Sequence, residues 1–344
     1  MCSLMTYSGI VTKIRAMQAK LLTDQDFENI AGLRSVPEVI EYLKEKPAYA
    51  EDLGQMDVAL YHRGNVEKVL YQSLYNDYTK IFRFAGMQQK KFLKLYWKQY
   101  EVVLINYCLR IVFKPFDLDY KKEVFDRYSQ ISIDRLITSR NIEELVDNLK
   151  DTEYYAPLKK IRDSGTGKLF DYDLALDLYY FSTLWRKEKR LLKRKEKELF
   201  TRDCGTKIDL LNLQWIYRAK KYYHMVPPDI YSLTIPIQYR LKHDEFKALV
   251  EAPTVEEFIK LVEETYYAKH YHFGDERTLE QMYRDAQRTL YLADRRRNPY
   301  SVAAINTYLF LKEEEIYKLT TALECIRYGL SARETLAYVG GVKQ

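Results

Sequence analysis

Acidic and basic side chains recur at one spacing in three stretches of the sequence. Each stretch opens with an acid, two stretches place an arginine nine residues later, and one adds an asparagine three residues after its acid. The candidate structural or interface residues are Glu101, Arg110, Asp209, Asn212, Arg218 and Glu315. These residue types suit ion pairs and helix caps, so we expect Arg110 and Arg218 to be half-buried against a carboxylate or a helix end. Truncating one member of a buried pair costs about 3–5 kcal/mol.

The three stretches differ at positions that would have to be identical if all three bound the same ligand. Leu104 takes the place of the asparagine in the first stretch. In the third stretch, Lys318 and Glu324 replace the asparagine and the arginine. These differences argue against one ligand that is common to all three stretches.

No other group of residues fits a catalytic or cofactor site. The segment Ser164–Lys168 resembles a phosphate-binding loop, but Arg162 replaces its first glycine and Leu169 replaces the hydroxyl residue after the lysine. The histidines are His62, His224, His243, His270 and His272, and none has another four residues away, the spacing of two zinc ligands on one helix face. We therefore expect no catalytic residue, no cofactor and no metal.

A strongly basic segment, Trp185–Arg202, contains nine lysines and arginines against three glutamates. Its candidate contact residues are Arg186, Lys187, Arg190, Lys193 and Arg194. The first interpretation is a solvated helix face with Glu–Lys pairs one turn apart. A second is contact with an acidic partner or a headgroup surface. Nucleic-acid binding is the weakest alternative, because no aromatic stacking module accompanies the charge.

The composition favours long amphipathic helices. The 344 residues include only 12 Gly and 9 Pro, whereas 30% are charged and 47% are hydrophobic. Few turn residues argue against a β-sandwich or barrel, and the charge and apolar content argue against disorder. The net charge of +6 is too small to make nucleic acid the default partner, and the 32 tyrosines suit half-buried helix faces. The cysteines are far apart, as in buried thiols of a reducing compartment.

Apolar periodicity predicts an all-α fold. Long helices are expected over about 66–84, 88–113 and 171–200, the last ended by Cys204-Gly205. Residues 231–237 are the one doubtful piece. The sequence contains no stretch long and apolar enough to span a bilayer, and no secretory signal at its start, so we expect a soluble intracellular protein.

Two elements repeat with a period near 107 residues. A capping-box pattern recurs at Ser35, Asn141 and Thr254, each with a glutamate three residues on and the same apolar stripe behind it. The acid-containing long helix recurs at nearly the same period. The first capped pair has no long helix before it and the last long helix has no capped pair after it, so one unit is split between the termini. We expect a closed ring of three helical units, made of 1–50 with 298–344, of 51–160 and of 161–297.

The chain resembles a known family, most clearly near its two ends. The residues Tyr7…Lys13-Ile-Arg15…Leu21-Leu22 and Asn298-Pro299…Glu315-Ile316 are similar to the C subunits of V-type (A-type) ATPases, which correspond to the d subunits of the eukaryotic enzymes. The resemblance covers nearly the whole chain and rests on the order and period of diffuse helix patterns. It implies three similar helical units that form a funnel, in agreement with the pseudo-threefold ring.

The resemblance also implies a function. A protein of this family is a central-stalk rotor subunit, a socket between the central shaft subunits (D/F type) and the membrane proteolipid ring, without chemistry of its own. It would be cytoplasmic and peripheral on the inner face of the membrane. The alternatives are a helical scaffold or nucleic-acid-binding protein that uses the basic segment, and an all-α enzyme with an unrecognised central site.

Overall fold

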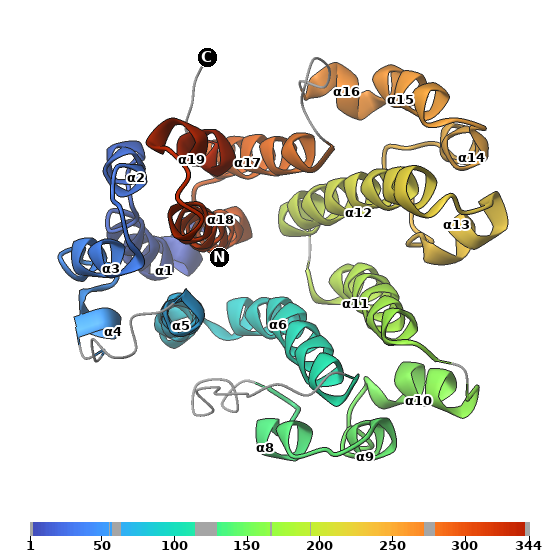
Figure 1. Ribbon diagram of the computed structural model, residues 1–344, viewed down its shortest axis with the longest axis horizontal. Coiled ribbons are helices and arrows are strands. Elements are labelled where there is room, and N and C mark those ends of the chain that lie inside the picture. The colour runs from blue at the N-terminus through green and yellow to red at the C-terminus, as the bar shows by residue number, and fades with distance from the viewer. Residues whose placement is uncertain are drawn as a thin grey trace. The chain divides into compact units, whose positions relative to one another are not determined.

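The computed structural model describes residues 3–54, 56, 63–113, 129–165, 167–192, 194–271 and 279–340 (Figure 1). Within these ranges the chain forms α-helices joined by turns and short loops, and no β-strand occurs. The expected all-α class is confirmed. The doubtful segment 231–237 is not a strand: its first residues end a helix and the rest is irregular.

The described residues divide into two compact units, one made of residues 3–87 and 298–340 and the other of residues 88–297. The two ends of the chain therefore share one unit. That unit also contains residues beyond position 50, which the repeat pattern of the sequence assigns to the next repeat. The division into three repeats stays a prediction.

In the first unit, the long C-terminal helix packs among helices from the beginning of the chain. The helices are α1 (Ser3–Gln18), α2 (Asp24–Ala31), α3 (Val36–Lys44), α4 (Ala50–Gly54), α5 (Arg63–Phe84), α18 (Val302–Arg327) and α19 (Ala332–Val339). Helix α18 contacts α1, α2, α3, α5 and α19, as Figure 1 shows in red against blue. Segments almost three hundred residues apart in sequence thus lie side by side.

The second unit contains four helices of 19 to 30 residues, with shorter helices between them. Its helices are α6 (Met87–Phe113), α8 (Ile133–Ile137), α9 (Ile142–Asp147), α10 (Tyr155–Asp163), α11 (Leu169–Leu191), α12 (Arg194–Tyr223), α13 (Pro227–Leu233), α14 (His243–Glu251), α15 (Val255–Glu264), α16 (Tyr266–His270) and α17 (Leu279–Arg297). Helix α12 contacts α11, α13, α15 and α17.

The three predicted helix starts are confirmed. The side-chain oxygens of Ser35, Asn141 and Thr254 accept hydrogen bonds from the backbone N–H three residues later, at 3.4, 2.8 and 3.2 Å. Each bond satisfies one of the N–H groups that a helix start leaves without a partner within the helix. Three separate helices therefore begin in the same way.

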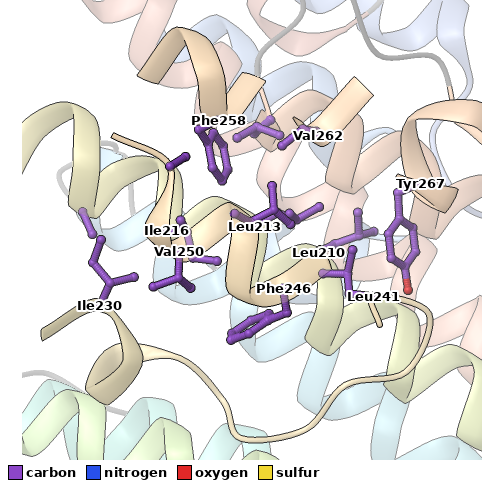
Figure 2. Packing of buried hydrophobic residues seen from close by; sticks show 14 of the residues in the cluster. Leu210, Leu213, Ile216, Ile230, Leu241, Phe246, Val250, Phe258, Val262 and Tyr267 are labelled. Atoms are coloured by element: carbon purple, nitrogen blue, oxygen red, sulfur yellow. The ribbon is translucent and has the colours of Figure 1, made fainter. Parts of the chain in front are cut away.

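The apolar stripe behind each cap forms the core of its region. In the third repeat, Phe246 and Val250 of α14 and Phe258 of α15 pack beside α12 (Figure 2). The matching residues of the other repeats, Val39, Ile40, Leu43, Leu145, Val146 and Leu149, are fully buried. Each such side chain contributes about 1.5–3 kcal/mol when it is buried.

The prediction of one helix over 171–200 is wrong. Helix α11 ends at Leu191, and α12 begins at Arg194, whose φ of 51° lies in the left-handed region. Helix α12 then continues through Cys204 and Gly205. Gly205 is a contact position and not a helix stop, because a Cβ there would lie 2.4 Å from Cγ of Tyr239.

The structure also bears on the expected state of the cysteines and on the length of the apolar helices. Cys108, Cys204 and Cys325 are buried free thiols, and burial raises the pKa of Cys108 to about 12. Cys2 lies outside the described residues. Among the helices that the structure describes, none combines the length and the apolar character that crossing a membrane requires.

Candidate functional site

Three acids at matched positions of the long helices are all buried and all hold a loop. Glu101 lies on α6, Asp209 on α12 and Glu315 on α18, and each side chain is almost inaccessible to solvent. Each carboxylate accepts hydrogen bonds from the backbone of the loop before a pair of short helices, the second of which is the capped one, and from a tyrosine hydroxyl after that pair. We call each acid with these partners a clasp.

The Asp209 clasp relies on backbone donors. Its carboxylate accepts the N–H groups of Tyr239, Arg240 and Leu241 at 3.0, 2.6 and 3.1 Å. The hydroxyl of Tyr267 donates a fourth bond at 2.7 Å, and Figure 2 shows this ring beside Leu210 and Leu241. Burial raises the pKa of Asp209, although these four bonds favour the ionised form.

The Glu101 clasp has the same plan. Its carboxylate accepts the N–H of Gln130 at 2.7 Å, the hydroxyl of Ser129 at 2.9 Å and the hydroxyl of Tyr154 at 2.5 Å. Burial and the nearby carboxylate raise the pKa of Tyr154 well above its usual range. Lys98, one turn before Glu101, is also buried.

Lys98 contributes a cation to this neighbourhood. Its ammonium forms an ion pair with Glu153, and burial lowers the pKa of Lys98 to about 8. Lys187 donates to the same carboxylate at 2.8 Å. Lys187, one of the candidate contact residues, is therefore held partly within the fold.

The Glu315 clasp joins the two ends of the chain. Its carboxylate accepts the N–H of Leu22 at 2.5 Å and the hydroxyl of Tyr49 at 2.5 Å. The buried ammonium of Lys312, one turn earlier on α18, donates to Glu315 at 3.0 Å and to the Tyr49 oxygen at 2.9 Å. Burial, with the carboxylate beside it, raises the pKa of Tyr49 well above its usual range.

The chemistry of the clasps is structural. Each carboxylate already accepts bonds from backbone and tyrosine donors, so its oxygens hold the fold and are not presented to a substrate. Among the described residues, no cluster of histidines, cysteines and acids could hold a metal ion. His270 stacks on Tyr266 instead, at 3.9 Å between ring centres, and His272 lies outside the described residues.

Asn212 adds a second attachment in the third repeat only. Its side-chain N–H donates to the carbonyl of Ile235 at 3.0 Å, and its oxygen accepts the N–H of Ile235 at 2.8 Å. At the matched positions, Leu104 is buried and Lys318 lies over the ring of Phe27. The third loop is thus held by both Asp209 and Asn212.

The expected burial of the two arginines is wrong. The Arg110 side chain is 56% exposed and pairs with Asp173 at 3.6 Å, and an exposed pair contributes under about 1 kcal/mol. Arg218 is exposed, and none of the acids that the structure describes forms an ion pair with it. Both side chains lie nine residues after a buried acid, on a helix face turned away from the core.

The basic segment is split between two helices. Arg186 and Arg190 are exposed on α11, whereas Arg194 is exposed at the start of α12. Lys193 lies outside the described residues. In the phosphate-loop lookalike, Ser164 and Gly165 follow the end of α10, and the N–H of Lys168 donates to Asp171 at the start of α11; Thr166 lies outside the described residues.

The tyrosines and Lys312 are the residues that the sequence reasoning missed. Tyr49, Tyr154 and Tyr267 follow the three helix caps by thirteen or fourteen residues. A search for a residue type shared by the three repeats after each cap could have found them. Lys312 carried a weaker signal: a lysine stands three residues before the acid at Lys98 and Lys312, but Thr206 takes that place before Asp209.

Comparisons with known proteins agree on one family. A family model described as ATP synthase (C/AC39) subunit matches residues 10–338. The C subunit of the A-type ATP synthase of Thermococcus kodakarensis is 26% identical over 98% of this chain and 91% of its own length. The corresponding protein of Archaeoglobus fulgidus is 23% identical over 95% of this chain and 94% of its own. That of Methanosarcina mazei is 25% identical over 76% of this chain and 71% of its own. The chain therefore belongs to the ATP synthase (C/AC39) subunit family.

Proposed function

We propose that this chain is the socket of a rotary ATPase, a rotor subunit that joins the central shaft to the membrane proteolipid ring. Family membership makes it a non-catalytic subunit of an A/V-type ATPase. The socket role goes further, and it assigns this chain the task of passing torque between ATP turnover and ion movement. Its partners would be the central shaft subunits (D/F type) and the ring.

The three clasps are the observation that carries the proposal. Glu101, Asp209 and Glu315 each tie a long helix to a loop and to a tyrosine in the same way. This common construction supports three related units, residues 1–50 with 298–344, 51–160 and 161–297. We extend it to a pseudo-threefold, funnel-like arrangement in which the long helices occupy equivalent places.

The long helices also share an apolar position outside the core. Two residues after each buried acid stand Val103, Leu211 and Tyr317. Val103 is 58% exposed, Tyr317 is 45% exposed and Leu211 is half-buried. Aromatic and apolar side chains form the cores of protein interfaces, so these matched positions are our candidates for the contact with the shaft.

A triple variant tests this surface. Changing Val103, Leu211 and Tyr317 to glutamate should weaken co-purification of the shaft subunits at least about tenfold, because interface cores tolerate charge poorly. The matched control changes three exposed apolar residues elsewhere, Phe170, Val226 and Tyr338, to glutamate. Equal retention of the shaft by both variants would show that the contact lies elsewhere.

The proposed location of the chain follows from its proposed role as the socket between shaft and ring. The chain would be a peripheral part of the complex at the cytoplasmic, inner face of the membrane, held there by its partner subunits. Fractionation of membranes with and without a chelating salt wash, followed by detection of this chain, measures that association. Recovery of the chain in the soluble fraction of cells with intact complexes would contradict it.

A further inference from the structure

Three helices of the second unit meet at one end. Helix α17 runs antiparallel to α12, because Arg202 pairs with Asp294 while the side chain of Gln214 donates to the carbonyl of Leu279 at 3.3 Å. Helix α11 is also antiparallel to α12, with Lys207 above the ring of Phe181. The ends of α11 and α17 and the start of α12 therefore lie at the same end of this bundle (Figure 1).

This end is covered with cationic side chains. We call it the basic end and define it by six exposed residues, Arg186, Arg190, Arg194, Lys195, Arg296 and Arg297. Two acids lie on the same turns of α12, the exposed Glu198 and the half-buried Glu196. The excess of positive charge thus comes from three separate helices and not from one solvated face.

Contacts within the fold leave these charges largely uncompensated. Arg202 and Lys187, just inside the basic end, pair with Asp294 and Glu153. In contrast, no ion pair joins Arg190, Arg194 or Arg296 to an acid in the part of the chain that the structure describes. The cations here are therefore available to a partner.

The start of α12 is an unfavourable place for cations. A helix N-terminus carries partial positive charge, which opposes Arg194 and Lys195. Arg194 also adopts a φ of 51°, in the left-handed region that non-glycine residues rarely occupy. Local energetics therefore do not account for cations at this site, whereas an external anion would.

We propose that the basic end binds a carboxylate-rich surface of a partner protein. Five of its six cations are arginines, whose planar guanidinium groups form paired hydrogen bonds with carboxylates. None of the exposed large hydrophobic residues of the described chain lies on the helix turns that carry these cations, residues 184–198 and 290–297. Insertion into a lipid surface uses such residues, and binding of single-stranded nucleic acid uses aromatic ones, so an acidic protein surface is the occupant that fits.

Binding of poly-L-glutamate to the full chain tests the proposal. The variant Arg190→Glu, Arg194→Glu, Arg296→Glu reverses one charge on each of the three helices. The control variant Arg140→Glu, Lys247→Glu, Lys260→Glu reverses three exposed charges elsewhere in the same unit, so the net charges of the two variants are equal. We expect the first variant to raise Kd at least about tenfold and the control less than about threefold, with a salt dependence that is lost with the first variant.

The other outcomes overturn the proposal. Equal losses in both variants would show that only net charge matters. Phosphatidylserine vesicles and single-stranded DNA serve as further probes, and a larger loss with either than with poly-L-glutamate would identify a different class of partner. Thermal melting of both variants should match that of the unaltered chain, because every substituted side chain is exposed. Since the measurement uses the isolated chain, its failure would leave the socket role, tested by co-purification, unaffected.

Discussion

The clasps at Glu315 and Asp209 compensate a buried negative charge in two different ways. Both carboxylates are buried, hold a loop and accept a tyrosine hydroxyl. Glu315 has the buried ammonium of Lys312 three residues earlier, whereas Asp209 has Thr206 in that place and three backbone N–H donors. A buried negative charge can thus be compensated by a cation or by a loop whose amides converge on it.

The two solutions have different consequences. In the Glu315 clasp, loss of either charge leaves the other buried and unpaired. In the Asp209 clasp, loss of the acid leaves amides of the 239–241 loop without an acceptor. We therefore expect the two regions to respond differently to substitution.

Removal of the acid beside Lys312 should lower the free energy of unfolding more than the other substitutions. Glu315→Ala leaves the Lys312 ammonium buried with only the Tyr49 oxygen as a partner, which should cost about 3–5 kcal/mol of unfolding free energy. Urea unfolding followed by circular dichroism measures the change. Glu28→Ala, at an exposed acid of the same unit, is the control and should cost under about 0.5 kcal/mol. A cost below about 1 kcal/mol for Glu315→Ala would show that the pair is not buried as described.

Asp209→Asn should lower the free energy of unfolding somewhat less than Glu315→Ala does. The amide keeps one acceptor oxygen, but its NH2 group faces backbone donors, so at least one N–H loses its partner at about 1–3 kcal/mol. The same unfolding measurement applies, with Glu263→Ala as the exposed control in that unit. An unchanged stability would mean that the amides of the 239–241 loop find other acceptors.

The Asp209 clasp should also respond to pH. Burial raises the pKa of Asp209 above the ordinary value of 3.8, so the folded chain holds this proton more tightly than the unfolded chain. The cost of ionisation is then fully present above the raised folded pKa and is lost as pH falls toward 3.8. The original chain should therefore gain stability relative to Asp209→Asn between about pH 7 and about pH 4.5. A gap that narrows over this range would contradict the assigned direction.

Substitution of the clasp tyrosines should cause the smallest losses of stability. Tyr49→Phe removes a hydroxyl that contacts both Glu315 and Lys312, whereas Tyr267→Phe removes one of four donors to Asp209. A hydrogen bond to a charged group contributes about 1.5–3 kcal/mol, and the Tyr49 hydroxyl makes two such bonds whereas that of Tyr267 makes one to Asp209, so Tyr49→Phe should be the more costly change. Thermal melts of the two variants side by side decide the order, and a reversed order would remove the distinction between the clasps.

Sequence patterns predicted the acids of this comparison but not their partners. Glu101, Asp209 and Glu315 follow a helical period, and the three helix caps follow a local rule, so both were found. The tyrosines come from separate short helices or loops, and only tertiary packing brings their hydroxyls to the acids.

Three errors of the sequence-based prediction have physical causes. A glycine often marks the end of a helix, but Gly205 lies inside α12, where the ring of Tyr239 leaves no space for a side chain. Arg218 matched Arg110 in sequence, but its helix face is exposed, and periodicity alone does not say which polar face meets solvent. The position of the break before Arg194 was missed because a charged run carries no turn residue.

The central claim, that this chain joins the shaft to the ring, is tested most directly by measuring ATP hydrolysis and ion uptake in the same liposomes. Complexes would be reconstituted with and without this chain. We predict that the soluble head still hydrolyses ATP without it, whereas ion uptake is lost because nothing connects shaft and ring. Normal ion uptake in its absence would contradict the socket role, and a collapse of hydrolysis by the head alone would point to a role in assembly or catalysis instead.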